Sequence, residues 1–322
     1  MHLEGVTLED LKVITGNSNP ELAKEIVANL GKKLTDAKVG RYPDGETNVH
    51  VKETVRGAYV FIVQSVAPPV NDNLMELLLL IDALKRASAK HIAAVIPYYG
   101  YARQDRKQTG RVPISAKLVA NMISTAGADR VLTVDLHAGQ IQGFFDMPVD
   151  NLRGDPFLAN YVEQKISSSE GVVVSPDVGG AKRARKVSSK LNMPLAIVEK
   201  KRNARDGNVE VLNLIGDVDC KRCLIVDDIV STAGTLTEVA GILKERGCRN
   251  VEAICTHGVF SGKALERIEK SPVKAVTVTN TIHNEEARGV DFVNYISVGN
   301  LFANTIKRIY KEKSVSTLFP HS

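Results

Sequence analysis

The sequence predicts an α/β protein built from parallel sheets, and three observations point to that fold class. Short apolar runs rich in β-branched residues recur along the chain, and longer segments with helical periodicity separate them. The runs are apolar at consecutive positions, which is typical of strands that are buried on both faces. A faint internal repeat and a length of 322 residues both favour two domains over one.

Two patterns identify the individual elements. Seven β-branched apolar runs are predicted to be strands: Val60–Val63, Ile92–Ile96, Val131–Val134, Val172–Val174, Leu224–Val226, Ala253–Thr256 and Ala275–Val278. Four segments with apolar residues at helical spacing are predicted to be helices: Asn73–Arg86, Ser115–Ala126, Gly180–Leu191 and Thr235–Arg246. Strands that alternate with helices in this way form parallel sheets covered on both faces.

The internal repeat sets the expected domain organisation. The segments "FIVQS…NDNLMELLLLIDALKRASAKHIAAVIPYYG" and "LIVDD…AGTLTEVAGILKERGCRNVEAICTHG" each give an apolar strand, a loop, a helix that begins Leu-x-Glu, and a second strand. A duplication would explain the likeness. We therefore expect two similar domains, residues 1–153 and 154–302, with the segment 303–322 returning to the first domain.

Charge and hydropathy exclude several classes of protein. The formal net charge is only +5, no run of five like charges occurs, and no motif that reads nucleic acid is visible. Residues 1–12 lack the basic start and apolar stretch of a signal peptide. The most apolar helical segment, Leu74–Leu84, carries two acids and is too short to span a bilayer. We expect a cytoplasmic protein that binds neither nucleic acid nor membrane.

The four cysteines imply no disulfide framework. Cys220 and Cys223 have a spacing found in zinc sites, but the second pair that a structural zinc site needs is missing. Cys223 opens an apolar strand, so we expect it to be a reduced thiol in or near the core.

The segment "CLIVDDIVSTAGT" (Cys223–Thr235) is the strongest candidate for a binding site. An apolar strand is predicted to end in Asp227-Asp228, and a loop of small and hydroxyl residues then leads into a helix. Backbone N–H groups of such a loop and the positive end of the helix dipole favour a phosphate. The two carboxylates can accept hydrogen bonds from sugar hydroxyls or hold magnesium. An N-capped helix with solvated aspartates is the alternative.

The loop residues carry a resemblance to a known family. Asp227-Asp228 followed by Ser231, Thr232, Ala233, Gly234 and Thr235 resembles the 5-phosphoribosyl 1-diphosphate loop of type I phosphoribosyltransferases and of ribose-phosphate diphosphokinases. The segments "DLHAGQIQGFFDMPVD", "YARQDRKQTGRVPISAKLVANMISTAGAD", "RYPDGETNV", "SPDVGGAKRA" and "THGVFSG" resemble the diphosphokinases in particular. The resemblance covers nearly the whole chain. It implies two doubly wound parallel-sheet domains of the type I phosphoribosyltransferase kind.

The resemblance also implies an activity and the residues that carry it. Diphosphate would pass from MgATP to the 1-hydroxyl of ribose 5-phosphate, which gives 5-phosphoribosyl 1-diphosphate and AMP for nucleotide biosynthesis. Lys200 and Arg202 match the family's catalytic cations, and Arg202 with the residues of the phosphate loop matches the ribose 5-phosphate site. His137 and Asp177 match magnesium ligands, with Asp135 a further metal candidate. From the residues alone, His137 could instead be a local hydrogen-bonding group, and the Lys200 cluster a solvated basic loop.

For ATP, the resemblance implies two segments of the first domain. They contribute Tyr42, Asp44, Gly45 and Glu46 from the "YPDGE" turn, together with Arg103 and Gln104. The family shares its adenine site between subunits, which implies a homo-oligomer of dimers assembled into a hexamer. Ser231 stands where many members have an acid, so one carboxylate contact to the sugar would be lost. A phosphoribosyltransferase that consumes the diphosphate and a catalytically silent family member are the rival interpretations.

Overall fold

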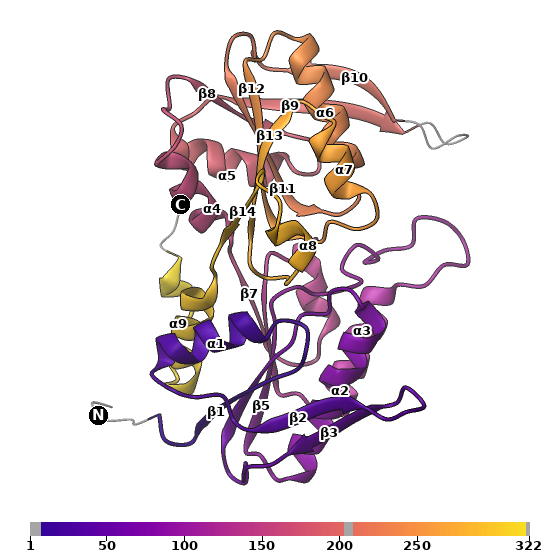
Figure 1. Ribbon diagram of the computed structural model, residues 1–322, viewed down its shortest axis with the longest axis vertical. Coiled ribbons are helices and arrows are strands. Elements are labelled where there is room, and N and C mark those ends of the chain that lie inside the picture. Colours follow the sequence, from indigo (N-terminus) through magenta and orange to yellow (C-terminus); the bar gives the residue numbers. More distant parts are fainter. Residues whose placement is uncertain (1–7, 203–208, 320–322) are drawn as a thin grey trace. The chain divides into compact units, whose positions relative to one another are not determined.

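The protein divides into two compact units in a computed structural model that describes residues 8–202 and 209–319 (Figure 1). Unit 1 contains the described residues up to Arg153, the short stretch Thr281–His283, and the described residues from Ser297 onward. Unit 2 contains Gly154–Asn280 and Asn284–Ile296. Across both described ranges, no helix is long and apolar enough to cross a membrane.

Unit 1 is built on a parallel sheet that, among the described residues, has five strands. In spatial order they are β1 (Leu11–Thr15), β4 (Tyr59–Val63), β5 (His91–Ile96), β6 (Arg130–Val134) and β7 (Val149–Leu152). A separate antiparallel hairpin is formed by β2 (Ala37–Arg41) and β3 (Thr47–Val51).

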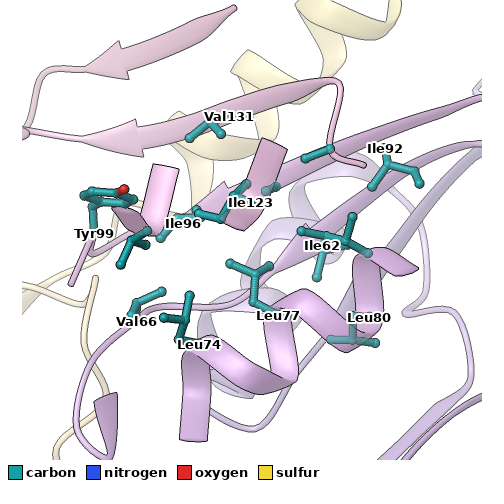
Figure 2. Close-up of a cluster of buried hydrophobic side chains, with 14 of the residues drawn as sticks. Ile62, Val66, Leu74, Leu77, Leu80, Ile92, Ile96, Tyr99, Ile123 and Val131 are labelled. Carbon is teal, nitrogen blue, oxygen red and sulfur yellow. The ribbon is translucent and has the colours of Figure 1, made fainter. Parts of the chain in front are cut away.

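Helices cover both faces of this sheet. On one face, α2 (Val70–Arg86) and α3 (Ser115–Ala126) pack with the β2–β3 hairpin, and Figure 2 shows Leu77 and Ile123 against Ile62 of β4. Alternate strand residues such as Phe61 are also buried and face the other side, where α1 (Pro20–Leu30) packs against α9 (Gly299–Tyr310). Two short 3₁₀ helices complete the unit, Gly139–Phe144 (η1) and Ser316–Leu318 (η2).

Unit 2 contains a sheet of seven strands among the described residues. Its spatial order is β10 (Val209–Ile215), β9 (Leu195–Arg202), β8 (Gly171–Ser175), β11 (Arg222–Val230), β12 (Asn250–Gly258), β13 (Val273–Thr279) and β14 (Val293–Ile296). Strand β10 pairs antiparallel with β9, and the other pairs are parallel. The order reverses between β8 and β11.

The alternation of side chains along β11 shows how unit 2 is layered. Leu224 and Val226 join the core beneath α4 (Asp155–Glu163) and α5 (Ala181–Leu191). Cys223 and Ile225 point to the opposite core, beneath α6 (Gly234–Glu245) and α7 (Ala264–Glu269). The short helix α8 (Glu285–Arg288) precedes β14.

The predicted fold class is confirmed, with one correction at the candidate site. Each of the seven predicted strands lies within an observed strand, and the four predicted helices occur with small shifts at their ends. The strand that was predicted to end in Asp227-Asp228 continues to Val230. Its pairing with β8 stops at Ile225, but pairing with β12 holds it extended as far as Val230. All four cysteines are free, with Cys220 exposed and the others buried.

Candidate active site

The acid pair of unit 2 lies where the topology of the sheet favours a ligand. Asp227 and Asp228 are near the carboxyl end of β11, and the neighbouring β8 ends at Ser175. The helices that follow these two adjacent strands, α5 and α6, lie on opposite faces of the sheet. Strands diverge at such a switch point and leave a crevice in which open α/β sheets bind their ligands.

A cation from α5 contacts both acids of this pair. The Nη1 atom of Arg183 lies 3.3 Å from Oδ1 of Asp227 and 3.1 Å from Oδ1 of Asp228. Burial raises the pKa of Asp227 to about 8, the charge of Asp228 adds to the increase, and Arg183 opposes it. The two carboxylates therefore form a strained pair that one guanidinium partly compensates.

The loop after β11 has the backbone of an anion site. Ala233 adopts a left-handed conformation, with φ 62°, and α6 begins at Gly234. The first turn of α6 contains no acid, so no side chain of that turn competes with an anion for the positive end of the helix. Thr232 is exposed, while Ser231, Gly234 and Thr235 are partly buried. The predicted loop residues Ser231–Thr235 are thus brought together at one helix terminus.

The "THGVFSG" segment holds this loop from the side. Ser261 donates its backbone N–H to the carbonyl of Ser231 at 2.9 Å, and the two hydroxyl oxygens are also 2.9 Å apart. Arg267 of α7 donates to the carbonyl of Thr232 at 2.9 Å. These contacts fix the backbone of the loop.

Asp177 stands at the carboxyl end of β8, beside the acid pair in the strand order. Its side chain is exposed, and its Oδ1 atom accepts a 2.7 Å hydrogen bond from the N–H of Gly180. The hydroxyl of Ser175 donates to the carbonyl of Asp177 at 2.7 Å. A short turn therefore presents this carboxylate just before α5 begins.

The two candidate catalytic cations lie on β9. Lys200 and Arg202 pair in backbone register with Val211 and Val209 of β10. Their side chains lie outside the described part of the chain, as do residues 203–208.

The "YPDGE" residues form the tip of the β2–β3 hairpin in unit 1. The turn is closed by backbone hydrogen bonds from Tyr42 N–H to Glu46 at 2.8 Å and from Gly45 N–H to Tyr42 at 2.9 Å. Gly45 has φ 95°, a conformation that side chains disfavour, and Asp44 accepts from the N–H of Glu46 at 3.1 Å. The ring of Tyr42 is 50% exposed, so a flat face is offered to solvent.

Arg103 and Gln104 lie in the long connection between β5 and α3. Arg103 is exposed, whereas Gln104 accepts from the hydroxyl of Ser115 at 2.6 Å through its side chain and from Ala116 N–H through its carbonyl. Gln104 therefore stabilises the start of α3, in addition to any contact that it makes with a ligand. Asp105 accepts a 3.2 Å hydrogen bond from Gln140 of η1. That contact joins this loop to the segment "DLHAGQIQGFFDMPVD", which contains His137.

Asp135 and His137 follow β6. Asp135 is partly buried with φ 42°, and His137 is exposed. Both belong to unit 1, whereas Asp177 belongs to unit 2. Within the described ranges, no three His, Cys, Asp or Glu side chains are gathered as a metal-binding group.

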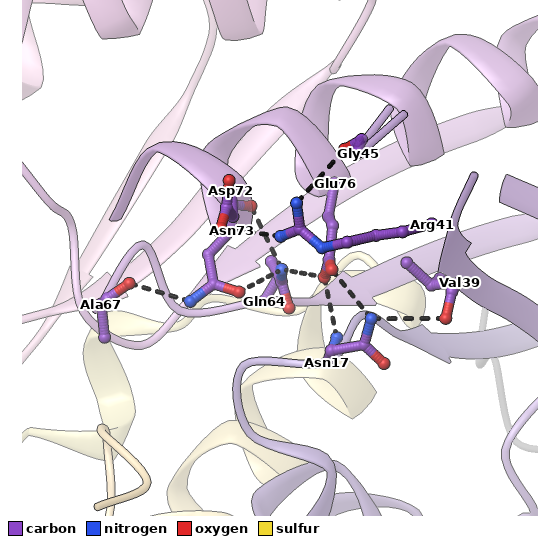
Figure 3. Close-up of polar contacts among 9 residues, drawn as sticks. All are labelled: Asn17, Val39, Arg41, Gly45, Gln64, Ala67, Asp72, Asn73 and Glu76. Atoms are coloured by element: carbon purple, nitrogen blue, oxygen red, sulfur yellow. Dashed lines mark hydrogen bonds and ion pairs between the residues drawn. The ribbon is translucent and has the colours of Figure 1, made fainter. Parts of the chain in front are cut away.

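In unit 1, the region that follows β1 and β4 is filled by polar side chains of the unit itself (Figure 3). Glu76 of α2 accepts from the side chain of Asn17, after β1, at 2.8 Å and from that of Gln64, after β4, at 2.9 Å. Gln64 also accepts from the hydroxyl of Ser18 at 2.7 Å, and Asn73 donates to the carbonyl of Ala67 at 2.8 Å. The hydrogen-bonding capacity that a ligand would use is here satisfied internally.

Three residues of the site were missed by the sequence-based reasoning: Arg183, Ser261 and Arg267. A signal existed for Arg183, since it shares a helical stripe with Val187 and Leu191, which are both buried. A cation on that stripe points toward the sheet. Ser261 and Arg267 reach the loop from the segment after β12 and from α7, contacts that no local pattern reveals.

Comparisons with known proteins identify relatives of the whole chain. A family model described as the N-terminal domain of ribose phosphate pyrophosphokinase matches residues 11–127. A second model, described as the phosphoribosyl synthetase-associated domain, matches residues 182–320. Ribose-phosphate pyrophosphokinase of Clostridium perfringens is 53% identical over 313 residues, 97% of this chain and 98% of the relative. The Thermotoga maritima protein of that name is 54% identical over 312 residues, 96% of this chain and 98% of its own.

A solved structure agrees with the sequence matches. The crystal structure of phosphoribosylpyrophosphate synthetase from Mycobacterium smegmatis superposes with a TM-score of 0.88 at 40% identity, covering 94% of this chain and 99% of that one. Two family models that together match most of the chain, and relatives more than half identical along nearly all of it, show that the chain belongs to the ribose-phosphate pyrophosphokinase family.

Proposed function

We propose that this protein is a ribose-phosphate diphosphokinase, which transfers the β,γ-diphosphate of MgATP to the 1-hydroxyl of ribose 5-phosphate and releases AMP. The observation that carries this proposal is a family match that runs through both units of a chain whose second unit holds the acid pair and phosphate loop at its switch point. A transferase that only consumes the product would not require the N-terminal family domain.

The reaction needs alignment and charge neutralisation more than covalent chemistry. The 1-hydroxyl oxygen of the sugar forms a bond to the β-phosphorus while the bond from that phosphorus to the α,β-bridging oxygen breaks. The electron pair of the broken bond leaves with AMP, and the proton of the hydroxyl is released to solvent. We assign Asp227 and Asp228 to the sugar hydroxyls, and the Ser231–Thr235 loop to the 5-phosphate. Lys200 would stabilise the migrating diphosphoryl group, and Arg202 would pair with phosphate oxygens.

The proposed ATP residues belong to unit 1. The exposed ring of Tyr42 suits stacking on adenine, and Asp44 and Glu46 can accept from its amino group. Arg103 is exposed and suits a phosphate contact. Gly45 shapes the turn that carries the adenine-binding groups, and Gln104 supports the site by fixing the start of α3.

Magnesium would be held by Asp177, His137 and Asp135, of which two supply carboxylate oxygen, the ligand this hard ion prefers. The fit is best seen at Asp177, an exposed carboxylate whose orientation is fixed by the N–H of Gly180. When bound, the ion would neutralise part of the triphosphate charge.

We also infer a cytoplasmic homo-oligomer, dimers assembled into a hexamer. The family resemblance implies an adenine site shared between subunits, and relatives match the chain along nearly its whole length. Light scattering after size-exclusion chromatography would test this, since a hexamer has six times the 35.0 kDa mass of the chain.

Direct assay tests the activity. Purified protein incubated with ribose 5-phosphate and MgATP should form AMP and 5-phosphoribosyl 1-diphosphate in equal amounts. Folded protein that binds both substrates yet forms no AMP would contradict the proposal and favour the silent-member alternative.

A matched pair of variants tests the catalytic cation. Lys200→Ala should lower kcat by about a hundredfold or more, because a fixed charge on the transferring group is lost, while binding of ribose 5-phosphate persists. Lys201→Ala removes the same charge one residue away and should keep near-normal kcat. Equal rates for both variants would refute the role of Lys200.

A further inference from the structure

Among the described residues of unit 2, Arg183 is a cation that contacts both members of the acid pair. Its Nη1 atom reaches Oδ1 of Asp227 and of Asp228, and its side chain is only 23% exposed. The Asp228 side chain is 5% exposed, so its charge has little access to water that could stabilise it.

The position of Arg183 follows from the packing of α5. Ala184, Val187 and Leu191 are buried and press the helix onto the sheet. Arg183 lies one turn before Val187 on the same stripe, so its side chain extends along the sheet toward the carboxyl end of β11. The turn that presents Asp177 immediately precedes this helix. One rigid element therefore places both a candidate metal ligand and a cation beside the acid pair.

The acid pair needs such a contact to hold its geometry. Adjacent carboxylates repel each other, and in a half-buried setting they lower that repulsion by turning apart or by taking up a proton. Asp227 also accepts a 2.8 Å hydrogen bond from the N–H of Asp228, which fixes only one of its oxygens. A guanidinium that reaches both Oδ1 atoms fixes the pair relative to each other.

We propose that Arg183 is a positioning residue for ribose 5-phosphate, which holds the Asp227 and Asp228 side chains oriented for the adjacent hydroxyls of the sugar. The proposal rests on the proposed function and adds to it a residue that acts through the acid pair. Its effect should be specific to the sugar, because the proposed ATP residues are carried by other elements.

Different effects on the KM for ribose 5-phosphate and the KM for ATP would distinguish a positioning role from a general loss of structure. In Arg183→Gln, the KM for ribose 5-phosphate should rise by about tenfold or more, the typical loss when a charged hydrogen-bond partner is removed. The KM for ATP should stay within about twofold of the parent value, since no contact of the proposed ATP residues is changed and the binding free energy should hardly move. Arg183→Lys keeps the charge but replaces the planar guanidinium with a smaller ammonium on a shorter side chain, so it should restore the KM in part.

The matched control is Arg185→Gln. Arg185 lies on the exposed side of the same helix, and the substitution makes the same change in charge. Initial rates with each substrate varied, calorimetric binding of ribose 5-phosphate without ATP, and thermal melting should be measured for all three variants and the parent. Arg185→Gln should match the parent in each.

The outcomes are distinct. Equal KM values for ribose 5-phosphate in Arg183→Gln and Arg185→Gln would overturn the proposal, as would a proportional rise in both KM values. If Arg183→Gln fails to fold, Arg183→Lys decides, because a folded lysine variant that binds the sugar as tightly as the parent would overturn a role for the guanidinium contact with the two carboxylates. If the parent protein itself forms no AMP, the proposed function fails, and calorimetry still tells whether Arg183 affects sugar binding.

Discussion

At the scale of single residues, the candidate site places two carboxylates where their ionisation is energetically unfavourable. Burial first, and the charge of Asp228 second, raise the pKa of Asp227 to about 8, whereas an unfolded chain would ionise it near the usual pKa of about 4. The proposed function accounts for this unfavourable pair, since carboxylates that are strained without ligand are ready to accept hydrogen bonds from a sugar.

A pH-dependent effect of Asp227→Asn follows from this pKa. Between about pH 4 and pH 8 the folded protein binds a proton at Asp227 that the unfolded chain releases, so the parent loses stability as the pH rises through that range. The asparagine variant cannot ionise. Its melting temperature should therefore exceed that of the parent by more at pH 8 than at pH 6, without substrates or magnesium.

Asp217→Asn is the control for that comparison. Hydrogen bonding to Lys221 lowers the pKa of the exposed Asp217, so this residue is ionised in both folded and unfolded chains from pH 6 to pH 8. Its variant should differ from the parent by a constant amount across that range. A constant difference for Asp227→Asn as well would contradict the burial of its charge.

Ser231 offers a second test at residue scale. Its hydroxyl lies 2.9 Å from that of Ser261, and the family resemblance places an acid at this position of the loop in many members. Ser231→Asp can accept from the Ser261 hydroxyl and from the sugar, so we expect calorimetric affinity for ribose 5-phosphate to be kept or improved. Ser231→Ala serves as the control, and a large loss in the aspartate variant alone would mean that the loop turns this side chain away from the ligand.

At the scale of elements, the β2–β3 hairpin is tied to the helix beside it. The guanidinium of Arg41 lies 2.7 Å from Asp72 of α2 and donates to the carbonyl of Gly45 at 3.3 Å, as Figure 3 shows. The ion pair therefore braces the turn that carries Tyr42. Since the two partners are 45% and 44% exposed, water and salt weaken the pair.

A modest effect on ATP is expected when this brace is removed. Asp72→Asn should raise the KM for ATP about two- to fivefold, the range for an exposed ion pair, and should leave the KM for ribose 5-phosphate unchanged. Asp82→Asn breaks a different exposed ion pair of the same helix, with Arg86, and should change neither constant. Raising the salt concentration should narrow the gap between Asp72→Asn and the parent, and a gap that persists undiminished would point to another role for Asp72.

Elements were predictable where one local pattern dominates. The central strands and the four long helices bury continuous runs or regular stripes, so the period of the sequence identifies them. Strand β2 contains Lys38 and Gly40 and mixes partly buried with exposed residues, so it gave no such signal. Strand β11 extends beyond its predicted end because pairing with β12 outweighs the polar character of Asp227 and Asp228.

The candidate site was predictable only as far as it is local. The residues from Asp227 to Thr235 are close in sequence, and the structure brings them together at the start of α6. Which strands lie side by side is not a local property, and therefore the switch point, the Arg183 contact and the support from Arg267 could not be derived before the sheet order was known.

At the scale of the whole molecule, the two units differ in the polar groups that follow two neighbouring parallel strands. In unit 1 the region that follows β1 and β4 is occupied by Asn17, Gln64 and Glu76, which hydrogen-bond to one another. In unit 2 the corresponding point between β8 and β11 presents carboxylates, a left-handed loop residue and the start of a helix. This contrast supports placing the sugar phosphate in unit 2, and leaves unit 1 to contribute through its hairpin and loops.

The path of the chain adds a prediction about stability. Helix α9 comes from the C-terminal part of the sequence, yet it packs against α1 in unit 1, and its Phe302 is fully buried. Phe302→Ala should cost about 3–5 kcal/mol of unfolding free energy, the usual range for deleting a buried aromatic side chain. The loss should fall on unit 1, which contains the start of the sequence.

Hydrogen exchange read by mass spectrometry can locate that loss. Phe302→Ala should speed exchange in α1, β1 and β4 while β12 and β13 keep parental protection. Phe260→Ala, which empties a buried site in the core of unit 2, should give the reverse pattern. If Phe302→Ala instead speeds exchange equally in both units, the two units unfold as one cooperative body, and the C-terminal helix stabilises the whole molecule instead of the unit into which it packs.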